Sequence, residues 1–176
     1  MKLLGIVGWS GAGKTTLIEA VLPHLMAAGL SVSTIKHAHK GFELDRPGKD
    51  SYRHQAAGAR EVLLLGDRRF ALLHEFGDAE PSLDSLLAHM EPVDLVLIEG
   101  FRDHPIPKLE VYRQALGLAP LWPTRPAIIA LATDAALEGS SSPPDAIARL
   151  DLNLPSQIAA WIATSSAIVD WKDRLQ

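Results

Sequence analysis

The 176-residue chain contains no cysteine. Without thiols it can form neither disulfides nor thiolate metal sites, and it has no cysteine nucleophile. The absence also fits a reducing compartment, where proteins seldom depend on disulfides.

Long apolar runs and an excess of positive charge are missing as well. No uninterrupted apolar run approaches the roughly 18 residues of a membrane-spanning helix, and residues 1–7 lack the apolar core and cleavage site of a signal peptide. The net charge of −4 gives no reason to expect general binding to nucleic acid or to an anionic membrane. We therefore expect a cytoplasmic protein with neither nucleic acid nor membrane among its partners.

What the chain does contain is the composition of a globular domain. Apolar residues make up 47% and charged residues 22% of it, which is typical of soluble domains. No repeat and no linker divides the sequence. We expect a single domain over residues 1–176, which is large enough to bury a core.

A phosphate-binding turn follows the first apolar run. Residues Gly8 to Thr16 read G-W-S-G-A-G-K-T-T and fill every fixed position of the P-loop, G-x-x-x-x-G-K-[ST]. Glycines permit positive φ and bring backbone N–H groups against phosphate oxygens, and the following helix adds unpaired N–H groups at its N-terminus. Lys14 can then reach the outer phosphates, and the Thr15 hydroxyl can bind magnesium. A glycine-rich turn that binds nothing is the alternative.

The order of apolar runs predicts an α/β fold, namely the three-layer α/β/α arrangement of P-loop NTPases with a mostly parallel sheet and an added antiparallel hairpin. Strands are expected at residues 2–7, 31–35, 93–98, 109–112 and 127–132. Helices are expected at residues 15–28, 82–90 and 155–164, with a short one through Ala57 that Asp50 or Ser51 caps.

Residues 60–76 predict the hairpin. Apolar runs at 61–65 and 70–74 flank Gly66-Asp67-Arg68-Arg69. Because a hairpin is antiparallel, it should lie at the edge of the parallel sheet or project from it. An exposed apolar edge needs a cover, so we interpret the hairpin as a candidate dimer surface. Packing within its own chain is an equal alternative.

A second motif ends in Glu99. The sequence from Asp94 to Gly100 reads D-L-V-L-I-E-G, a buried strand with a carboxylate at its end, as in a Walker B strand. Such a strand normally runs beside the first one, which would bring Glu99 near the P-loop. There it can hold magnesium directly or through water, or orient an attacking water. A strand-end charge facing solvent is the alternative.

The polar segment after the second strand holds His37, His39 and Asp45. His37 and His39 share a face if the strand continues. They are candidates for sensing phosphate or magnesium of a bound nucleotide, or for binding a second anion. A transition metal would require a third ligand, which is not evident, and an ordinary polar loop is the alternative. Asp45 is a second candidate ligand in the magnesium shell.

Asp134 follows a late strand, Ala130-Leu131-Ala132-Thr133. An aspartate in this place can accept both N1–H and N2–H₂ of guanine, a donor pair that adenine lacks. No Asn-Lys pair precedes it, so a turn or helix-cap aspartate is the alternative.

Together these segments resemble the bacterial MobB family, the molybdopterin-guanine dinucleotide biosynthesis adaptors. The matching stretches are Gly8 to Leu17, Ile35 to His39, Asp45 to Arg53, Leu97 to Phe101 and Pro105 to Glu110. The resemblance implies a homodimeric GTP-binding protein with at most weak magnesium-dependent hydrolysis. It also implies a partner, a MobA-type guanylyltransferase that attaches GMP to molybdopterin, and it makes molybdopterin a further candidate ligand.

The resemblance also implies roles for individual residues. Thr15 and Glu99 would serve magnesium, and Lys14 and Glu99 would be the catalytic residues. Lys40 stands where the family usually has a further histidine, which disfavours a metal role for the loop and leaves anion binding. The GTP phosphates would be bound by Gly11, Ala12, Gly13, Lys14, Thr15 and Thr16.

Two other functions remain open from the residues alone. A P-loop kinase for a small metabolite needs a base and usually an arginine-bearing lid, and no lid insertion is obvious in this chain. A metallochaperone GTPase would require a richer histidine or cysteine tract than His37 and His39 provide.

Overall fold

The computed structural model describes residues 1–38, 45–77, 79–135 and 143–171. The chain divides into two compact units, one formed by Met1–His37 with Pro92–Gln176 and the other by Ala38–Glu91. The expectation of a single domain stays a prediction. None of the helices in the described part of the chain has both the length and the apolar character that crossing a membrane requires.

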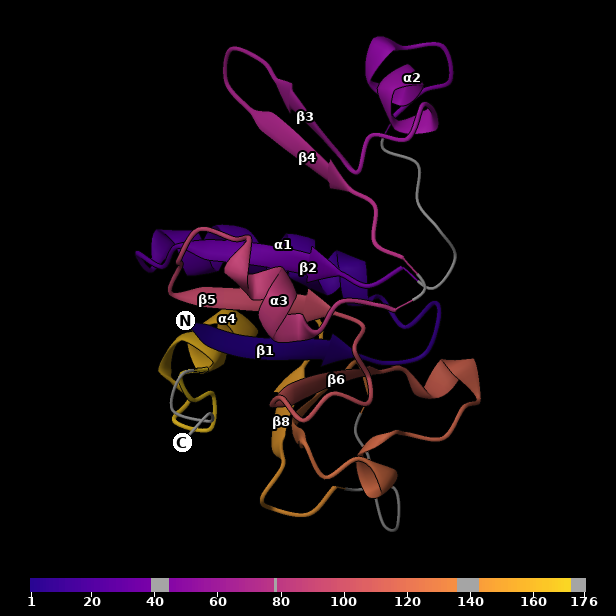
Figure 1. The fold of residues 1–176 in the computed structure, drawn as a ribbon. Helices are drawn as coiled ribbons and strands as arrows, with labels where there is room; N and C mark the ends of the chain where they lie inside the picture. Colours follow the sequence, from indigo (N-terminus) through magenta and orange to yellow (C-terminus); the bar gives the residue numbers. More distant parts are fainter. Residues whose placement is uncertain (39–44, 78, 136–142, 172–176) are drawn as a thin grey trace. The chain divides into compact units, whose positions relative to one another are not determined.

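The first unit is built on a six-stranded sheet in the order β2-β5-β1-β6-β7-β8, in which neighbouring strands are parallel (Figure 1). Its strands are β1 (Lys2–Val7), β2 (Val32–Lys36), β5 (Leu95–Glu99), β6 (Lys108–Tyr112), β7 (Ile128–Thr133) and β8 (Ala148–Asp151). Its helices are α1 (Lys14–Ala27) and α4 (Pro155–Thr164), with 3-10 turns η1 (Gln114–Leu116) and η2 (Trp122–Thr124).

The predicted strands and helices of this unit are confirmed, with ends that differ by one or two residues. One further strand, β8, is present that the sequence pattern does not predict. This edge strand has only four residues, half of them exposed, so it lacks the sustained apolar run that marks a buried parallel strand.

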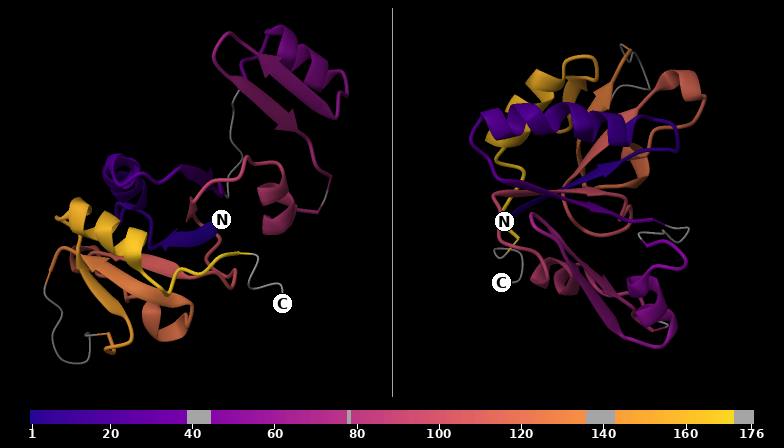
Figure 2. Two further views of the ribbon diagram at one scale, coloured as in Figure 1. Left: turned by 90° about the vertical axis from the view of Figure 1, so that its left-hand side faces the viewer. Right: turned by 90° about the horizontal axis from the view of Figure 1, so that it is seen from above.

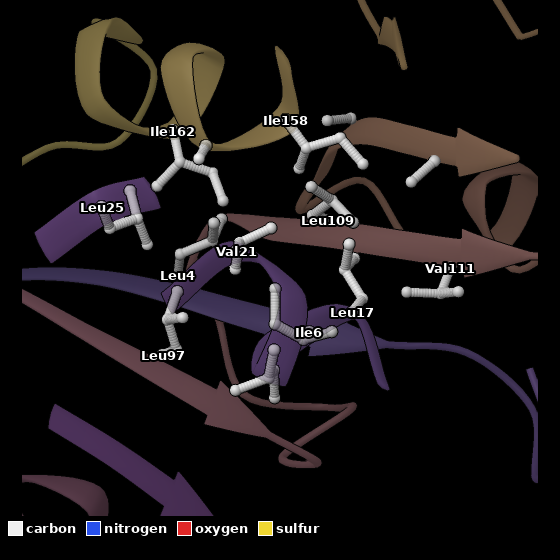
Figure 3. Packing of buried hydrophobic residues seen from close by; sticks show 14 of the residues in the cluster. Leu4, Ile6, Leu17, Val21, Leu25, Leu97, Leu109, Val111, Ile158 and Ile162 are labelled. Atoms are coloured by element: carbon white, nitrogen blue, oxygen red, sulfur yellow. The ribbon is translucent and has the colours of Figure 1, made fainter. Parts of the chain in front are cut away.

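The main core lies between one face of the sheet and the two long helices. Because side chains alternate along a strand, Leu4 and Ile6 of β1 point to this face. Helices α1 and α4 lie beside each other (Figure 2). Figure 3 shows the side chains that meet here, among them Leu17, Val21, Leu25, Leu97, Leu109, Val111, Ile158 and Ile162. This packing fixes the start of α1 over the end of β1.

The opposite face of β6 buries two charged side chains. Lys108 is 2% exposed and Glu110 is fully buried. The Glu110 carboxylate accepts hydrogen bonds from the backbone N–H groups of Leu121, at 2.7 Å, and Trp122, at 2.9 Å. The Lys108 ammonium donates to the carbonyl of Ile106 at 3.0 Å. Glu110 thus ties the segment between β6 and β7 to the sheet.

The second unit contains α2 (Asp50–Ala56), β3 (Glu61–Leu65), β4 (Phe70–His74) and α3 (Leu83–Ala88). Strands β3 and β4 form an antiparallel sheet of their own, which confirms the predicted hairpin and its bounds. The predicted cap of α2 is wrong: its N-cap is Lys49, which makes no side-chain cap hydrogen bond, and Asp50 is already helical. The α/β class, with a mostly parallel sheet and an antiparallel hairpin, is confirmed.

Candidate functional site

The P-loop joins β1 to α1 through three glycines with positive φ, Gly8 at 145°, Gly11 at 80° and Gly13 at 96°. A Cβ atom on Gly8 would lie 2.4 Å from the carbonyl oxygen of Val111 in β6, a distance at which no side chain fits. Gly13 is the left-handed N-cap residue of α1. Glycine is therefore required both for the path of the turn and for its contact with the sheet.

Lys14 is held at this turn by two carbonyl groups. Its ammonium nitrogen donates to Gly8 and to Trp9, each at 3.1 Å. Partial burial lowers the pKa of Lys14, and the positive charges of Arg102 and Lys36 lower it further, while the negative charge of Glu99 opposes them. Burial and the neighbouring cations disfavour the charged form of Lys14. A phosphate group beside it would add negative charge and so favour the ammonium ion.

Thr15 and Glu99 meet as the Walker B interpretation predicts. Strands β1 and β5 pair in parallel with Ile6 opposite Glu99, so the carboxylate lies beside the start of α1. The Thr15 hydroxyl donates to the two Glu99 oxygens, at 3.1 and 3.0 Å. Lys36 contributes an ion pair to the same carboxylate at 3.5 Å. Glu99 is largely buried, with 14% of its side chain exposed.

These oxygen atoms fit a magnesium ion. Mg²⁺ prefers oxygen ligands and usually binds through one or two protein groups plus phosphate oxygens and water. The Thr15 hydroxyl and the Glu99 carboxylate offer that set. In the described ranges of the chain, no group of three or more histidine, aspartate or glutamate side chains is placed to hold a metal by itself.

His37 lies directly beside the end of β5. Its backbone N–H donates to the Glu99 carbonyl at 2.9 Å, and its Cβ atom lies 2.8 Å from where a Cβ of Gly100 would be. Its ring faces that of Phe101 at 4.6 Å between centroids. The structure thus brings His37 to the Walker B end, while its role toward a nucleotide stays a prediction.

The other two residues of that predicted loop are placed less directly. His39 lies outside the described residues. Asp45 belongs to the second unit, where its Oδ1 accepts a hydrogen bond from the backbone N–H of Arg46 at 2.8 Å. Its Oδ2 is buried and has no hydrogen-bond partner in the described part of the chain. Its place in a magnesium shell stays a prediction.

Asp134 is connected to the P-loop through a residue that the sequence analysis does not single out. Its carboxylate forms an ion pair with the Arg113 guanidinium, and the Nε of Arg113 donates to the Ala12 carbonyl at 3.1 Å. Arg113 directly follows β6, so its position after a strand end was the available signal. The expected guanine contact of Asp134 stays a prediction.

Arg102 is a second basic residue that the sequence analysis passes over. Its guanidinium carbon lies 5.0 Å from the ring centroid of Trp9, the second residue of the P-loop. The indole N–H of Trp9 donates to the Ala119 carbonyl at 2.8 Å, which fixes the ring. A basic residue three positions after Glu99 was the available signal.

Comparison with known proteins identifies the family of this chain. The family model of molybdopterin guanine dinucleotide synthesis protein B matches residues 3–134. A molybdopterin-guanine dinucleotide biosynthesis adapter protein from Haemophilus influenzae is 42% identical over 165 residues, 92% of this chain and 88% of that protein. The adapter protein of Escherichia coli is 39% identical over 123 residues, 68% of this chain and 70% of that protein.

A solved structure shares the fold of this chain. The crystal structure of a MobB protein homolog from Bacillus stearothermophilus is similar to the chain with a TM-score of 0.66 and 25% identity, over 92% of this chain and 94% of that one.

Proposed function

The chain belongs to the molybdopterin guanine dinucleotide synthesis protein B family, and we propose that it is a GTP-binding adaptor that assists a MobA-type guanylyltransferase in forming molybdopterin guanine dinucleotide. The relatives from Haemophilus influenzae and Escherichia coli carry the name of adapter proteins in this synthesis. The proposed role is nucleotide binding and engagement of the partner enzyme, with at most slow hydrolysis.

The observation that carries the proposal is the convergence of three P-loop elements at one point. The glycine turn offers backbone N–H groups, Lys14 offers an ammonium ion that donates to two backbone carbonyls, and Thr15 is bonded to Glu99. A nucleoside triphosphate with Mg²⁺ would satisfy all three, because its phosphates take the donors and its metal takes the two side-chain oxygens.

The surroundings of Glu99 favour binding over rapid turnover. A base that activates water needs a carboxylate oxygen free to bond that water. Glu99 is already bonded to the Thr15 hydroxyl and ion-paired with Lys36. We infer that Glu99 acts mainly as a magnesium ligand or as the group that orients magnesium-bound water.

Guanine is the base that the proposal favours. Asp134 lies at the end of β7 and is linked by Arg113 to the P-loop carbonyl of Ala12. The ion pair with Arg113 fixes the orientation of the Asp134 carboxylate, and an ionised carboxylate is an acceptor only. Such a group pairs with the two N–H donors on the guanine edge, whereas adenine offers no equivalent pair.

A homodimer is also part of the proposal, with the hairpin as its contact surface. In the β3–β4 register, Leu63 faces Leu72 and Leu65 faces Phe70, so these four side chains share one face of the hairpin. They are 59%, 40%, 80% and 68% exposed, respectively. A contiguous apolar face of this kind is typical of an interaction site, and a second copy of the chain would offer a matching apolar surface.

The experiment that tests nucleotide binding is a titration of the purified chain with GTP and with ATP in the presence of Mg²⁺, alongside Lys14→Ala. We expect GTP to bind with slow turnover, and Lys14→Ala to abolish binding. Hydrolysis is then measured with small-molecule acceptors and with a MobA-type enzyme. Unchanged GTP affinity of Lys14→Ala would refute the site, and rapid acceptor-dependent release of a nucleoside diphosphate would indicate a kinase.

A further inference from the structure

The turn that follows Glu99 has an unfavourable backbone conformation. Gly100 has a φ of 106° and Phe101 a φ of 48°, and Phe101 is the one non-glycine residue with positive φ in the described part of the chain. A side chain with a Cβ atom rarely adopts this region unless the surroundings enforce it. Backbone strain of this kind is concentrated at functional sites.

Two rings hold Phe101 in this conformation. The His37 ring lies 4.6 Å from the Phe101 ring, and the His104 ring meets it edge-on at 6.3 Å. The His104 backbone N–H also donates to the Phe101 carbonyl at 3.1 Å. Gly100 is packed against His37 with no room for a side chain. The turn is therefore fixed from both sides, and its conformation is built into the fold.

The result is that Arg102 lies over the P-loop. Its guanidinium is 5.0 Å from the Trp9 ring centroid, and the Trp9 carbonyl accepts a hydrogen bond from Lys14. Among the described residues, no carboxylate forms an ion pair with Arg102. Its positive charge is close enough to Lys14 to help lower the pKa of that ammonium group. The Arg102 guanidinium and the Lys14 ammonium both contact Trp9. Two neighbouring positive charges favour the binding of an anion.

We propose that Arg102 is a binding residue for the terminal phosphate of the nucleotide, which it would reach from its contact with the Trp9 ring. The inference rests on the proposed nucleotide-binding function. A cation–π contact is weaker than a charge-assisted hydrogen bond to phosphate, so a bound triphosphate would draw the guanidinium from the ring. The planar fork of arginine fits two phosphate oxygens at once.

His37 supports the same turn from the other side of Phe101. By stacking on Phe101 and packing on Gly100, His37 keeps the turn in the conformation that directs Arg102 toward the P-loop. His37 is then a positioning residue that acts through the turn.

The test compares the binding of a slowly hydrolysed GTP analogue, GTPγS, with that of GDP, both with Mg²⁺. The proteins are wild type, Arg102→Ala, Arg102→Lys and the control Arg149→Ala, which removes an arginine that pairs with Asp145. Arg102→Ala should weaken GTPγS binding about tenfold or more, as expected for a lost bond to a charged group, and should change GDP binding much less. Arg102→Lys should restore part of the affinity, and Arg149→Ala should bind as wild type.

Tryptophan fluorescence supplies a second measurement on the same proteins. Adding GTPγS to wild type should change the emission, because the guanidinium leaves the Trp9 ring. The change should be absent in Trp9→Phe and in Arg102→Ala. The inference alone would be overturned if Arg102→Ala bound GTPγS as tightly as wild type does. It would also be overturned if the variant lost affinity for GTPγS and for GDP by the same factor. A wild-type chain that binds neither nucleotide would overturn the proposed function and this inference together.

Discussion

The Thr15 hydroxyl and the Glu99 carboxylate, 84 positions apart in sequence, are joined by hydrogen bonds of 3.1 and 3.0 Å. Parallel pairing of β1 with β5 creates this contact, because it aligns the ends of the two strands. The contact occupies the place where a P-loop protein holds its metal ion. The assignment of this contact as the magnesium site can therefore be tested by a substitution that removes the charge of Glu99 and keeps the size of its side chain.

Glu99→Gln should reduce the affinity for Mg²⁺ in the nucleotide complex by about tenfold or more, since a charged ligand is replaced by a neutral one. The measurement is a Mg²⁺ titration of GTP binding. Asp94→Asn is the matched control, because Asp94 lies just before the start of the same strand and bonds to Ser31. That variant should leave the Mg²⁺ dependence unchanged. Equal effects of the two variants would contradict the assignment of Glu99.

Asp134→Asn should lower the preference for GTP over ATP. The amide cannot accept from both guanine N–H donors, so GTP affinity should fall by about tenfold or more, with little change for ATP. Competition binding of the two nucleotides measures the ratio. Arg113→Lys serves as a comparison, since it keeps the charge beside Asp134 but not the planar group that also reaches Ala12. A preference that survives Asp134→Asn would show that the base is selected elsewhere.

Leu65→Lys should shift the chain from dimer to monomer. The substitution places a charge on the exposed apolar face at the turn end of the hairpin, where Leu65 is 80% exposed and opposite Phe70. Sedimentation equilibrium over a range of protein concentrations gives the dissociation constant. Leu64→Lys is the comparison on the other face of the hairpin, because adjacent residues of a strand point to opposite sides. A wild-type chain that is monomeric at all concentrations would remove the hairpin from consideration as a dimer surface.

Glu110 gives the fold a pH dependence. Burial raises the pKa of the Glu110 carboxyl above its usual value of 4.5, although the N–H groups of Leu121 and Trp122 oppose the shift. The folded protein therefore binds this proton more tightly than the unfolded chain. The contribution of Glu110 to stability is fully present below pH 4.5 and declines as the pH rises through the raised pKa.

Glu110→Gln isolates this effect, because its amide does not titrate. The free energy of unfolding of wild type minus that of Glu110→Gln should increase as the pH falls from about 8 to about 5. Urea unfolding at several pH values measures it. Glu110→Ala should be destabilised by about 2 kcal/mol or more at all of them, since two buried N–H groups lose their acceptor. A pH-independent difference between wild type and Glu110→Gln would contradict the raised pKa.

The predictable parts of this site were those with fixed local spacing. The P-loop has its ligands within nine consecutive residues, and Glu99 terminates an apolar strand of characteristic form. The hairpin bounds were predictable because two apolar runs flank a glycine turn. Each of these signals is contained in a short stretch of sequence, and each is confirmed as structure.

The remaining parts depend on distant contacts. Arg102 lies over Trp9 just after a residue, Phe101, whose ring contacts that of His37. Arg113 reaches Ala12 from the end of β6. Each of these arginines follows the end of a strand, but that position alone does not say which group the side chain will contact. The short strand β8 is likewise defined by its pairing with β7 and not by its own sequence.

The contact between Gly8 and Val111 makes the site rigid on one side. The backbone atoms there are so close that not even a methyl group fits, so the P-loop cannot move toward β6 when a ligand enters. Any adjustment must take place on the other side, where side chains of Lys14, Arg102 and Glu99 can change partners. Binding of a nucleotide would then change side-chain positions mainly on the β5 side of the P-loop. A partner protein that recognises the nucleotide-bound chain should contact that side.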